Sequence, residues 1–294
     1  SFKTRFLGQL LHVQRVGANG SPAQAARLLR HWNGRADAIG LRQIDGDAEG
    51  EALRALATRS PLTTGARLAE IFLEWAVRHA QTTLGHYFDN ANVLFFSGLA
   101  NAKLAASMAE YSDNLLFADP LLQLGVPKLL TSLDALNLYA TGAHLVADWV
   151  PPRAMPGALL RDWTRYVLRK AMTKASVVVA PAHELDDFGL EELAGKTIIT
   201  TTVNDERLAR FKAKGVQLVI DGAPIVQGHA LDPALLDAMI LAATGKAPDQ
   251  LLEDDYLDIL TGEGLEPRLL YPNGFKRINR FAFVIHPLSQ EYFK

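Results

Sequence analysis

Polar residues suited to nucleotide binding follow two apolar runs in the first half of the chain, residues 93–96 and 115–118. Gly98 lies just after the first run, and Asp119 directly follows the second. A turn after a buried strand leaves backbone N–H groups free at a helix N-terminus, where a phosphate can bind. An acid at the end of the next strand can accept hydrogen bonds from a ribose. We therefore expect four residues to bind a nucleotide cofactor: Ser97, Gly98, Asn101 and Asp119.

The same four residues are also consistent with an ordinary turn. A complete dinucleotide motif has three glycines, because the turn, the pyrophosphate and the helix packing each need one, and here only Gly98 is present. Asp119 lies about 20 residues after the glycine, as expected of a ribose-binding acid. Pro120 instead favours a plain turn at the end of a strand.

Residues that follow the later apolar runs could line the same nucleotide-binding crevice. His183 follows the run 177–180, and histidine titrates near neutral pH, so it is our candidate for proton transfer. It is also consistent with a histidine at a helix start beside acidic neighbours. Hydroxyl and amide groups after the run 197–201 could bind a phosphate, although Asn204 also suits a helix cap. From this group we expect cofactor contacts by Thr200, Thr202 and Asn204.

The last third of the chain adds candidates for substrate binding. Asp221 ends a further apolar run, and the segment 271–280 is rich in cationic and hydrogen-bonding groups. Such a segment suits an anionic ligand, and it suits a docking surface between domains equally well. The expected substrate contacts are Asp221, Asn273, Lys276 and His286.

Composition excludes several classes of function. The chain has no cysteine, which rules out disulfides, a thiolate nucleophile and thiolate-bound metal, and the eight histidines are scattered, so we expect no metal. A net charge of -2 offers no field for nucleic acid, which we do not expect as a partner. No apolar run reaches the roughly 18 residues of a membrane span. We expect a cytoplasmic protein.

Alternating strand-like and helix-like segments predict an α/β fold with a doubly wound, mainly parallel, Rossmann-like sheet. We expect six strands, three of them, including residues 126–130, before a helical crossover at 131–174. The topological switch would then lie between residues 93–96 and 177–180. Residues 5–45 suggest a smaller βαβ unit, in which residues 4–17 form a strand or a bent hairpin and residues 36–44 form the second strand. The expected domains are a small α/β domain, 1–88, and the Rossmann-like domain, 89–294.

The stretches GKTIITTTVNDERLARFKAKGVQLVIDGAP and YPNGFKRINRFAFVIHPLS, with FFSGLANAKLA and LLFADPLLQLG before them, resemble a bacterial family. The family is that of quinate/shikimate dehydrogenase-like proteins, and the chain is similar to their amino-terminal half. Their second half is similar to long-chain acyl-carrier-protein reductase. The resemblance implies an NAD(P)-linked context, with a reductase-like domain beyond Lys294.

Two functions follow from these patterns. The first is an NAD(P)-linked dehydrogenase or reductase region that binds NAD, NADP or an anionic small ligand in a cleft between the domains. The second is a non-catalytic region of a larger reductase-like protein that binds a ligand or docks a partner. The expected partners are a small-molecule ligand and either a second copy of the chain or the reductase-like domain.

Overall fold

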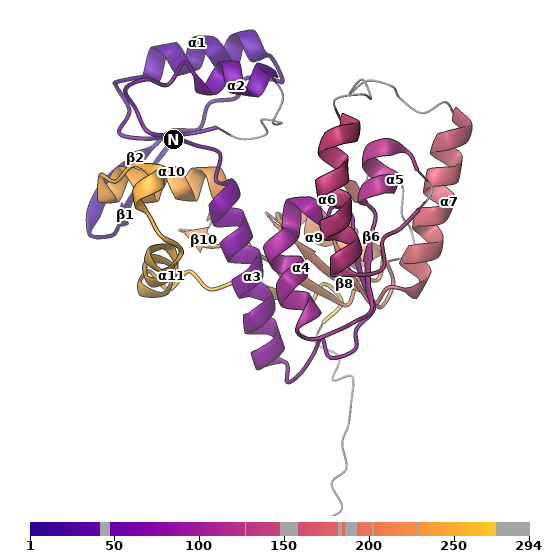
Figure 1. The fold of residues 1–294 in the computed structure, drawn as a ribbon. Helices are drawn as coiled ribbons and strands as arrows, with labels where there is room; N and C mark the ends of the chain where they lie inside the picture. The colour runs from indigo at the N-terminus through magenta and orange to yellow at the C-terminus, as the bar shows by residue number, and fades with distance from the viewer. Residues whose placement is uncertain are drawn as a thin grey trace, which may run out of the picture.

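A six-stranded sheet forms the centre of the computed structural model (Figure 1). Its order is β12-β9-β8-β7-β5-β6, and neighbouring strands are parallel except for β12, which runs antiparallel to β9. The strands are β5 (Val93–Phe95), β6 (Leu115–Phe117), β7 (Val177–Val179), β8 (Thr197–Thr200), β9 (Leu218–Asp221) and β12 (Arg268–Leu270). The structure describes residues 1–41, 48–126, 128–147, 158–181, 184–185, 193–201, 203–226 and 229–274.

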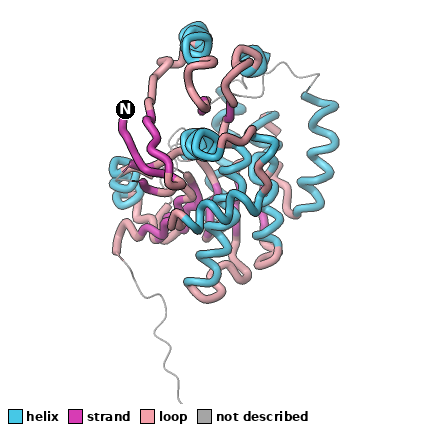
Figure 2. Tube along the Cα trace, turned by 90° about the vertical axis from the view of Figure 1, so that its left-hand side faces the viewer, coloured by secondary structure: helices cyan, strands magenta, loops and turns pink. Residues whose placement is uncertain are grey.

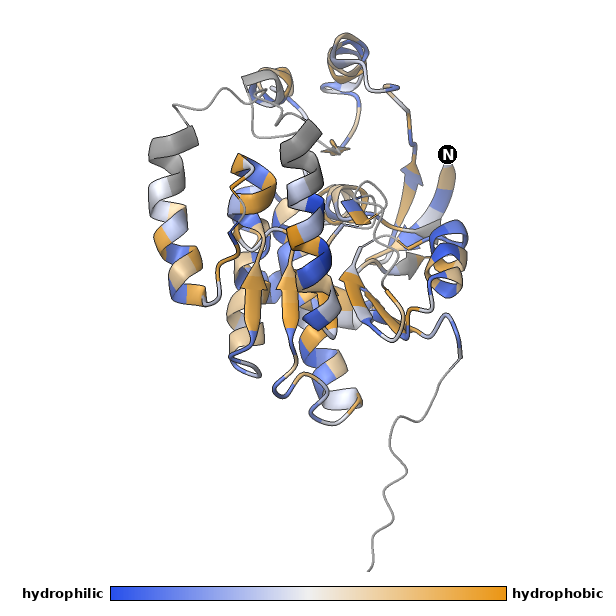
Figure 3. Cartoon of the chain, turned by 90° about the vertical axis from the view of Figure 1, so that its right-hand side faces the viewer, coloured by the Kyte–Doolittle hydropathy of each residue, from blue (hydrophilic) through white to orange (hydrophobic). Residues whose placement is uncertain are grey.

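Helices cover both faces of the sheet, which explains why its strands are almost entirely apolar. One face packs against α3 (Ala66–Thr83), α4 (Ala102–Ala109) and α6 (Leu133–Ala147). The other packs against α5 (Asp119–Leu124), α7 (Ala158–Lys174) and α9 (Asp205–Ala213). Figure 3 shows the hydrophobic strands between these helices. The predicted α/β class and the mainly parallel sheet are confirmed.

The direction of winding reverses between β5 and β7. The chain passes from β5 outward to β6, and α6 and α7 then carry it to β7 on the other side of β5. This is the predicted topological switch. The predicted strand at residues 126–130 is wrong, because only Leu130 pairs with Phe117, in an isolated antiparallel bridge. The sixth place in the sheet belongs to β12 instead.

The first residues of the chain form a hairpin, the alternative expected for residues 4–17, and not the first strand of a βαβ unit. β1 (Phe2–Phe6) and β2 (Gln9–Val13) make an antiparallel hairpin with each other. After α1 (Pro22–Trp32), β3 (Ile39–Gly40) pairs in parallel with β4 (Leu62–Thr63), which follows α2 (Ala48–Arg54). Of the second strand predicted at 36–44, the structure describes residues 36–41, and of these Ile39 and Gly40 are in a strand, which pairs with a partner that comes later in the chain.

A third core brings together segments that lie far apart in the sequence. It contains Phe6 and Val13 of the hairpin, the first half of α3, and residues of α10 (Pro233–Thr244) and α11 (Glu253–Gly262). Between these helices lies the short 3-10 turn η2 (Pro248–Gln250), and before them the small hairpin β10 (Ile225–Val226) and β11 (His229–Ala230). The division into domains at residue 88 stays a prediction, but segments from both sides of it share this core.

Helix α3 connects this third core to the sheet. Its first half contributes Leu68, Ile71 and Phe72 to the third core, while its second half packs on the sheet through Val77 and Ala80. In Figure 1 it runs between α10 and α11 on one side and α4 on the other, and Figure 2 shows the same layers from the side. No helix in the described ranges is long and apolar enough to cross a membrane.

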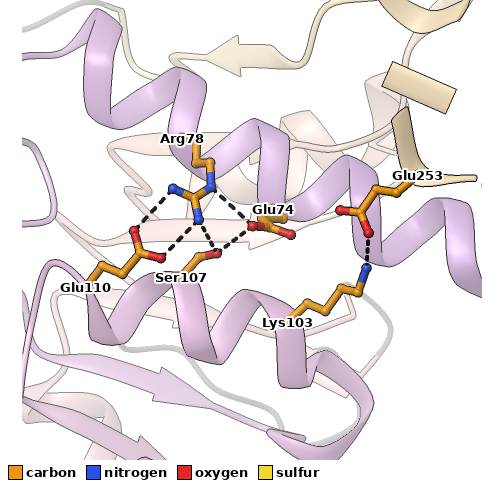
Figure 4. Close-up of polar contacts among 6 residues, drawn as sticks. All are labelled: Glu74, Arg78, Lys103, Ser107, Glu110 and Glu253. Carbon is orange, nitrogen blue, oxygen red and sulfur yellow. Dashed lines mark hydrogen bonds and ion pairs between the residues drawn. The ribbon is translucent and has the colours of Figure 1, made fainter. Parts of the chain in front are cut away.

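Polar contacts hold α3 and α11 against α4 (Figure 4). Arg78 of α3 pairs with Glu110 at 3.0 Å and donates to Ser107 Oγ at 3.2 Å. Lys103 of α4 pairs with Glu253 of α11 at 2.5 Å. These side chains are partly exposed, so each pair contributes at most about 1 kcal/mol. The apolar contacts of α3 therefore carry most of the connection.

Candidate functional site

The turn after β5 is held by Asp119, the residue expected to bind a ribose. Its carboxylate, which is fully buried, accepts hydrogen bonds from Gly98 N at 2.8 Å, Leu99 N at 3.0 Å and Ser97 Oγ at 3.2 Å. Asn101 Nδ2 donates to the carbonyl oxygen of Ser97. The four predicted cofactor residues therefore do lie together. The expectation that the amides of this turn are free is wrong for Gly98 and Leu99, because both donate to the protein itself.

Gly98 is required here by packing. Its φ of -71° is accessible to any residue. A Cβ at this position would lie 2.4 Å from Phe117 Cδ1 and 2.8 Å from Leu136 Cδ2. The short 3-10 turn η1 (Leu99–Asn101) thus approaches β6 and α6 closely. Gly98 and Asp119 therefore form a packed turn whose hydrogen bonds are made within the protein.

Asp221 at the end of β9 is also fully engaged. Its buried carboxylate accepts from Val203 N at 3.0 Å and Ala223 N at 2.9 Å, and it forms an ion pair with Arg268 of β12. Burial raises the pKa of Asp221, and the positive charge of Arg268 opposes that shift. Arg268 also donates to the carbonyl oxygens of Val203 and Ala223. The cluster fastens β12 to the sheet edge.

The remaining predicted residues divide into three groups. Asn204 caps α9 by accepting from Arg207 N, and Asn273 donates to the carbonyl oxygens of Lys212 and Val216. Thr200, at the end of β8, is 3% exposed, and its hydroxyl oxygen has no hydrogen-bond partner among the residues that the structure describes. The other four lie outside the described residues: His183, Thr202, Lys276 and His286.

A cavity lies at the N-terminal end of α3, away from the predicted residues. Its volume is about 310 Å³, and the residues that line it come from two segments, 54–67 and 237–256. We call it the α3 pocket. Its lining residues are Arg54, Leu62, Thr63, Thr64, Ala66, Arg67, Asp237, Pro248 and Tyr256. Within the described ranges, no group of three or more histidine and acidic side chains could hold a metal ion.

The floor of the α3 pocket is a buried hydrogen-bonded triad. Asp237 of α10, which is 3% exposed, accepts from the hydroxyl of Tyr256 at 2.8 Å and from the hydroxyl of Thr63. Thr63 Oγ1 in turn accepts from Gly65 N at 2.9 Å. Burial and the neighbouring Asp237 raise the pKa of Tyr256, so its phenol stays protonated further into the alkaline range than an ordinary tyrosine. The triad joins β4, α10 and α11.

The rim of the α3 pocket is cationic. Arg54, at the end of α2, and Arg67, in the first turn of α3, are both exposed. Arg67 donates to the carbonyl oxygen of Leu251 at 2.7 Å, and its guanidinium lies 5.8 Å from the centre of the Tyr256 ring. Neither arginine forms an ion pair with a carboxylate of the described residues. Both positive charges therefore line the pocket without a carboxylate partner among the described residues.

The start of α3 adds further positive potential to the rim. Gly65 precedes the helix with a φ of 70°, and no side chain caps the helix there. Its missing side chain is also required sterically, because a Cβ would lie 2.3 Å from Ala234 N. The first turn contains no acid. An uncapped helix N-terminus carries roughly half a positive charge on its free amides.

Sequence reasoning missed the α3 pocket, although part of its pattern is visible. Leu62-Thr63-Thr64-Gly65 is a short β-like run, a hydroxyl pair and a glycine before an amphipathic helix, which is the pattern that singled out Gly98. The residues of the pocket floor, however, do not occur together in any short stretch of the sequence. Asp237 and Tyr256 come far later in the chain and reach Thr63 only through the third core.

Family comparisons divide the chain at the same helix. A family model described as a domain of unknown function (DUF8754) matches residues 67–272, and another so described (DUF8753) matches residues 1–71. The two ranges meet in the first turns of α3, and both contribute residues to the α3 pocket. No curated protein matches the chain.

Proposed function

The chain belongs to the family described as a domain of unknown function (DUF8754), which names no activity, and we propose that it binds a small anionic ligand in the α3 pocket. The observation that carries the proposal is a set of positive groups around one cavity that have no carboxylate partner among the described residues: Arg54, Arg67 and the uncapped start of α3. This role corresponds to the non-catalytic ligand-binding alternative.

Electrostatics supports an anion at the rim. Arginine presents several N–H groups in a plane that matches carboxylate and phosphate oxygens. An anion near a helix N-terminus gains about 0.3–1 kcal/mol from the free amides. Arg67 is additionally held in place by its contacts with Leu251 and the Tyr256 ring, so less of its side-chain entropy is lost on binding.

The test is a calorimetric titration of the whole chain with inorganic phosphate, sulfate and acetate. We expect binding that weakens with added salt and that weakens about tenfold in Arg54→Gln, the loss of roughly 1.4 kcal/mol. The matched control is Arg30→Gln in α1, an exposed arginine outside the pocket, which is expected to bind as the native chain does. Native-like binding by Arg54→Gln would contradict the proposal.

A nucleotide at the carboxyl edge of the sheet is a second candidate. The winding reverses between β5 and β7, where open α/β sheets of the Rossmann-like kind bind ligands, and Thr200 brings an unpartnered hydroxyl to the same edge. NAD or NADP would be the ligand, in a cytoplasmic dehydrogenase or reductase. The partner would be a reductase-like domain or a second copy of the chain. The engaged amides of Gly98 and Leu99 weigh against a phosphate on that turn.

A thermal-shift screen with NAD, NADP, CoA and acyl-CoA tests this second candidate. A shift with a dinucleotide that is lost in Thr200→Val would support it, because that substitution removes the hydroxyl and keeps the shape of the side chain. Asp119→Ala is a poor probe here, since it removes three hydrogen bonds whether or not a nucleotide binds. No shift with any of the four ligands would contradict the candidate.

A further inference from the structure

The α3 pocket contains a negative charge as well as positive ones. The carboxylate of Asp237 forms part of its floor, and the residue is only 3% exposed. The hydrogen bonds that it accepts come from Thr63 and Tyr256, which are both neutral hydroxyls. No cation of the described residues forms an ion pair with it. By comparison, the buried carboxylate of Asp119 accepts three hydrogen bonds, two of them from backbone amides.

A simple anion does not account for this floor. An anion seated at Arg54 and Arg67 leaves Asp237 without a cation, and an anion seated deeper is repelled by it. A carboxylate oxygen accepts about two hydrogen bonds, so each oxygen of Asp237 retains acceptor capacity beyond its one hydroxyl partner. The floor is therefore suited to a further donor, and a positively charged donor gains most from it.

We infer that the ligand of the α3 pocket is a small zwitterion of the amino-acid type. Its ammonium group binds Asp237 at the floor, and its carboxylate binds Arg54, Arg67 and the first amides of α3 at the rim. This inference rests on the proposed anion binding and adds the second charge to it. The volume of about 310 Å³ lies at the small end of the range for ligand pockets, about 300–1,000 Å³.

Neighbouring groups favour this orientation of the ligand. Tyr256 and Thr63 already donate to Asp237, so the carboxylate oxygens are fixed in direction before a ligand arrives. The positive groups are all at the exposed rim and the negative group is at the buried floor. A zwitterion therefore enters with its ammonium end first.

The experiment titrates the whole native chain with a panel of free L-amino acids by calorimetry. Each amino acid is compared with its N-acetyl derivative, which lacks the ammonium charge, and with its amide, which lacks the carboxylate. Inorganic phosphate serves as the simple anion. We expect the preferred amino acid to bind roughly 30-fold more tightly than either derivative, as for loss of one partner from a buried charge pair.

Asp237→Asn is the matched variant. It is expected to bring the affinities for the free and the N-acetylated ligand within about threefold of each other and to leave phosphate binding at the rim intact. Asp258→Asn, at an exposed position of α11, is the control and is expected to behave as the native chain does. The ligand comparison on the native chain remains decisive if Asp237→Asn does not fold.

The outcomes separate the two proposals. If phosphate binds through Arg54 but N-acetyl derivatives bind as tightly as free amino acids, the zwitterion is wrong and the anion site stands. The same holds if phosphate binds and no amino acid does. If neither phosphate nor any amino acid binds, both proposals fail.

Discussion

Replacing Asp119 tests whether its role is to hold the turn after β5. The buried carboxylate accepts three hydrogen bonds, from Gly98 N, Leu99 N and Ser97 Oγ, at 2.8, 3.0 and 3.2 Å. A hydrogen bond to a charged group contributes about 1.5–3 kcal/mol, and bonds that share one acceptor are not additive. We expect Asp119→Ala to lower the free energy of unfolding by about 4 kcal/mol, a large part of the about 5–15 kcal/mol of a typical domain.

The assay is urea unfolding followed by circular dichroism, with the slope of the transition checked for change. Asp119→Asn keeps an acceptor oxygen and should cost about half as much, roughly 2 kcal/mol. Asp113→Ala removes an exposed acid just before β6 and should change stability by less than about 0.5 kcal/mol. A loss of under about 1 kcal/mol in Asp119→Ala would refute the structural role and return this acid to the nucleotide hypothesis.

Three further predictions concern stability and titration. Thr200→Val should raise the free energy of unfolding, measured in urea, by about 1 kcal/mol, because the buried hydroxyl of Thr200 has no partner among the described residues. A lower free energy of unfolding in this variant would mean that the hydroxyl does have a partner. Gly65→Ala should cost about 3 kcal/mol in the same assay, since its Cβ would meet Ala234 N, whereas Gly142→Ala in α6, which meets nothing, should not destabilise. The raised pKa of Tyr256 means that folding favours its protonated form; this stabilisation is complete below about pH 10 and falls as pH rises further, because the unfolded chain ionises first. Unfolding followed from about pH 8 to 12 should show a smaller alkaline loss in Tyr256→Phe than in the native chain, and equal losses would argue against the triad.

The central sheet could be predicted from the sequence because its signals are local. Most of the parallel strands are short apolar runs, such as Val177–Val179, that are followed by a polar residue or a turn. Helices covering both faces make these runs apolar throughout. The long helical segment at 131–174 also predicted the reversal of winding between β5 and β7, which the strand order confirms.

Strand pairing over long distances could not be predicted. Arg268 of β12 binds Asp221 of β9 and so attaches β12 to the edge of the sheet. The three residues 268–270 contain no local pattern that distinguishes a strand of this sheet from a loop. The hairpin of residues 2–13 packs on α10 and α11, which are more than 200 residues away. Patterns of a few residues carry no information about such partners.

The candidate site shows the same limit in its chemistry. Gly98 and Asp119 have the spacing of a nucleotide site, and they do meet, but the carboxylate binds the amides itself. A sequence states which groups are present and does not state which are already engaged. The α3 pocket shows the reverse, since Arg54 and Asp237 have no shared motif and still line one cavity.

A crystal structure of the chain soaked with phosphate tests the central claim most directly. The account predicts density for the anion at the rim of the α3 pocket, in contact with Arg54, Arg67 and the first amides of α3. It predicts none at residues 97–99, where Asp119 occupies the amides of Gly98 and Leu99. Phosphate bound at that turn, with Asp119 displaced and the α3 pocket empty, would contradict the account.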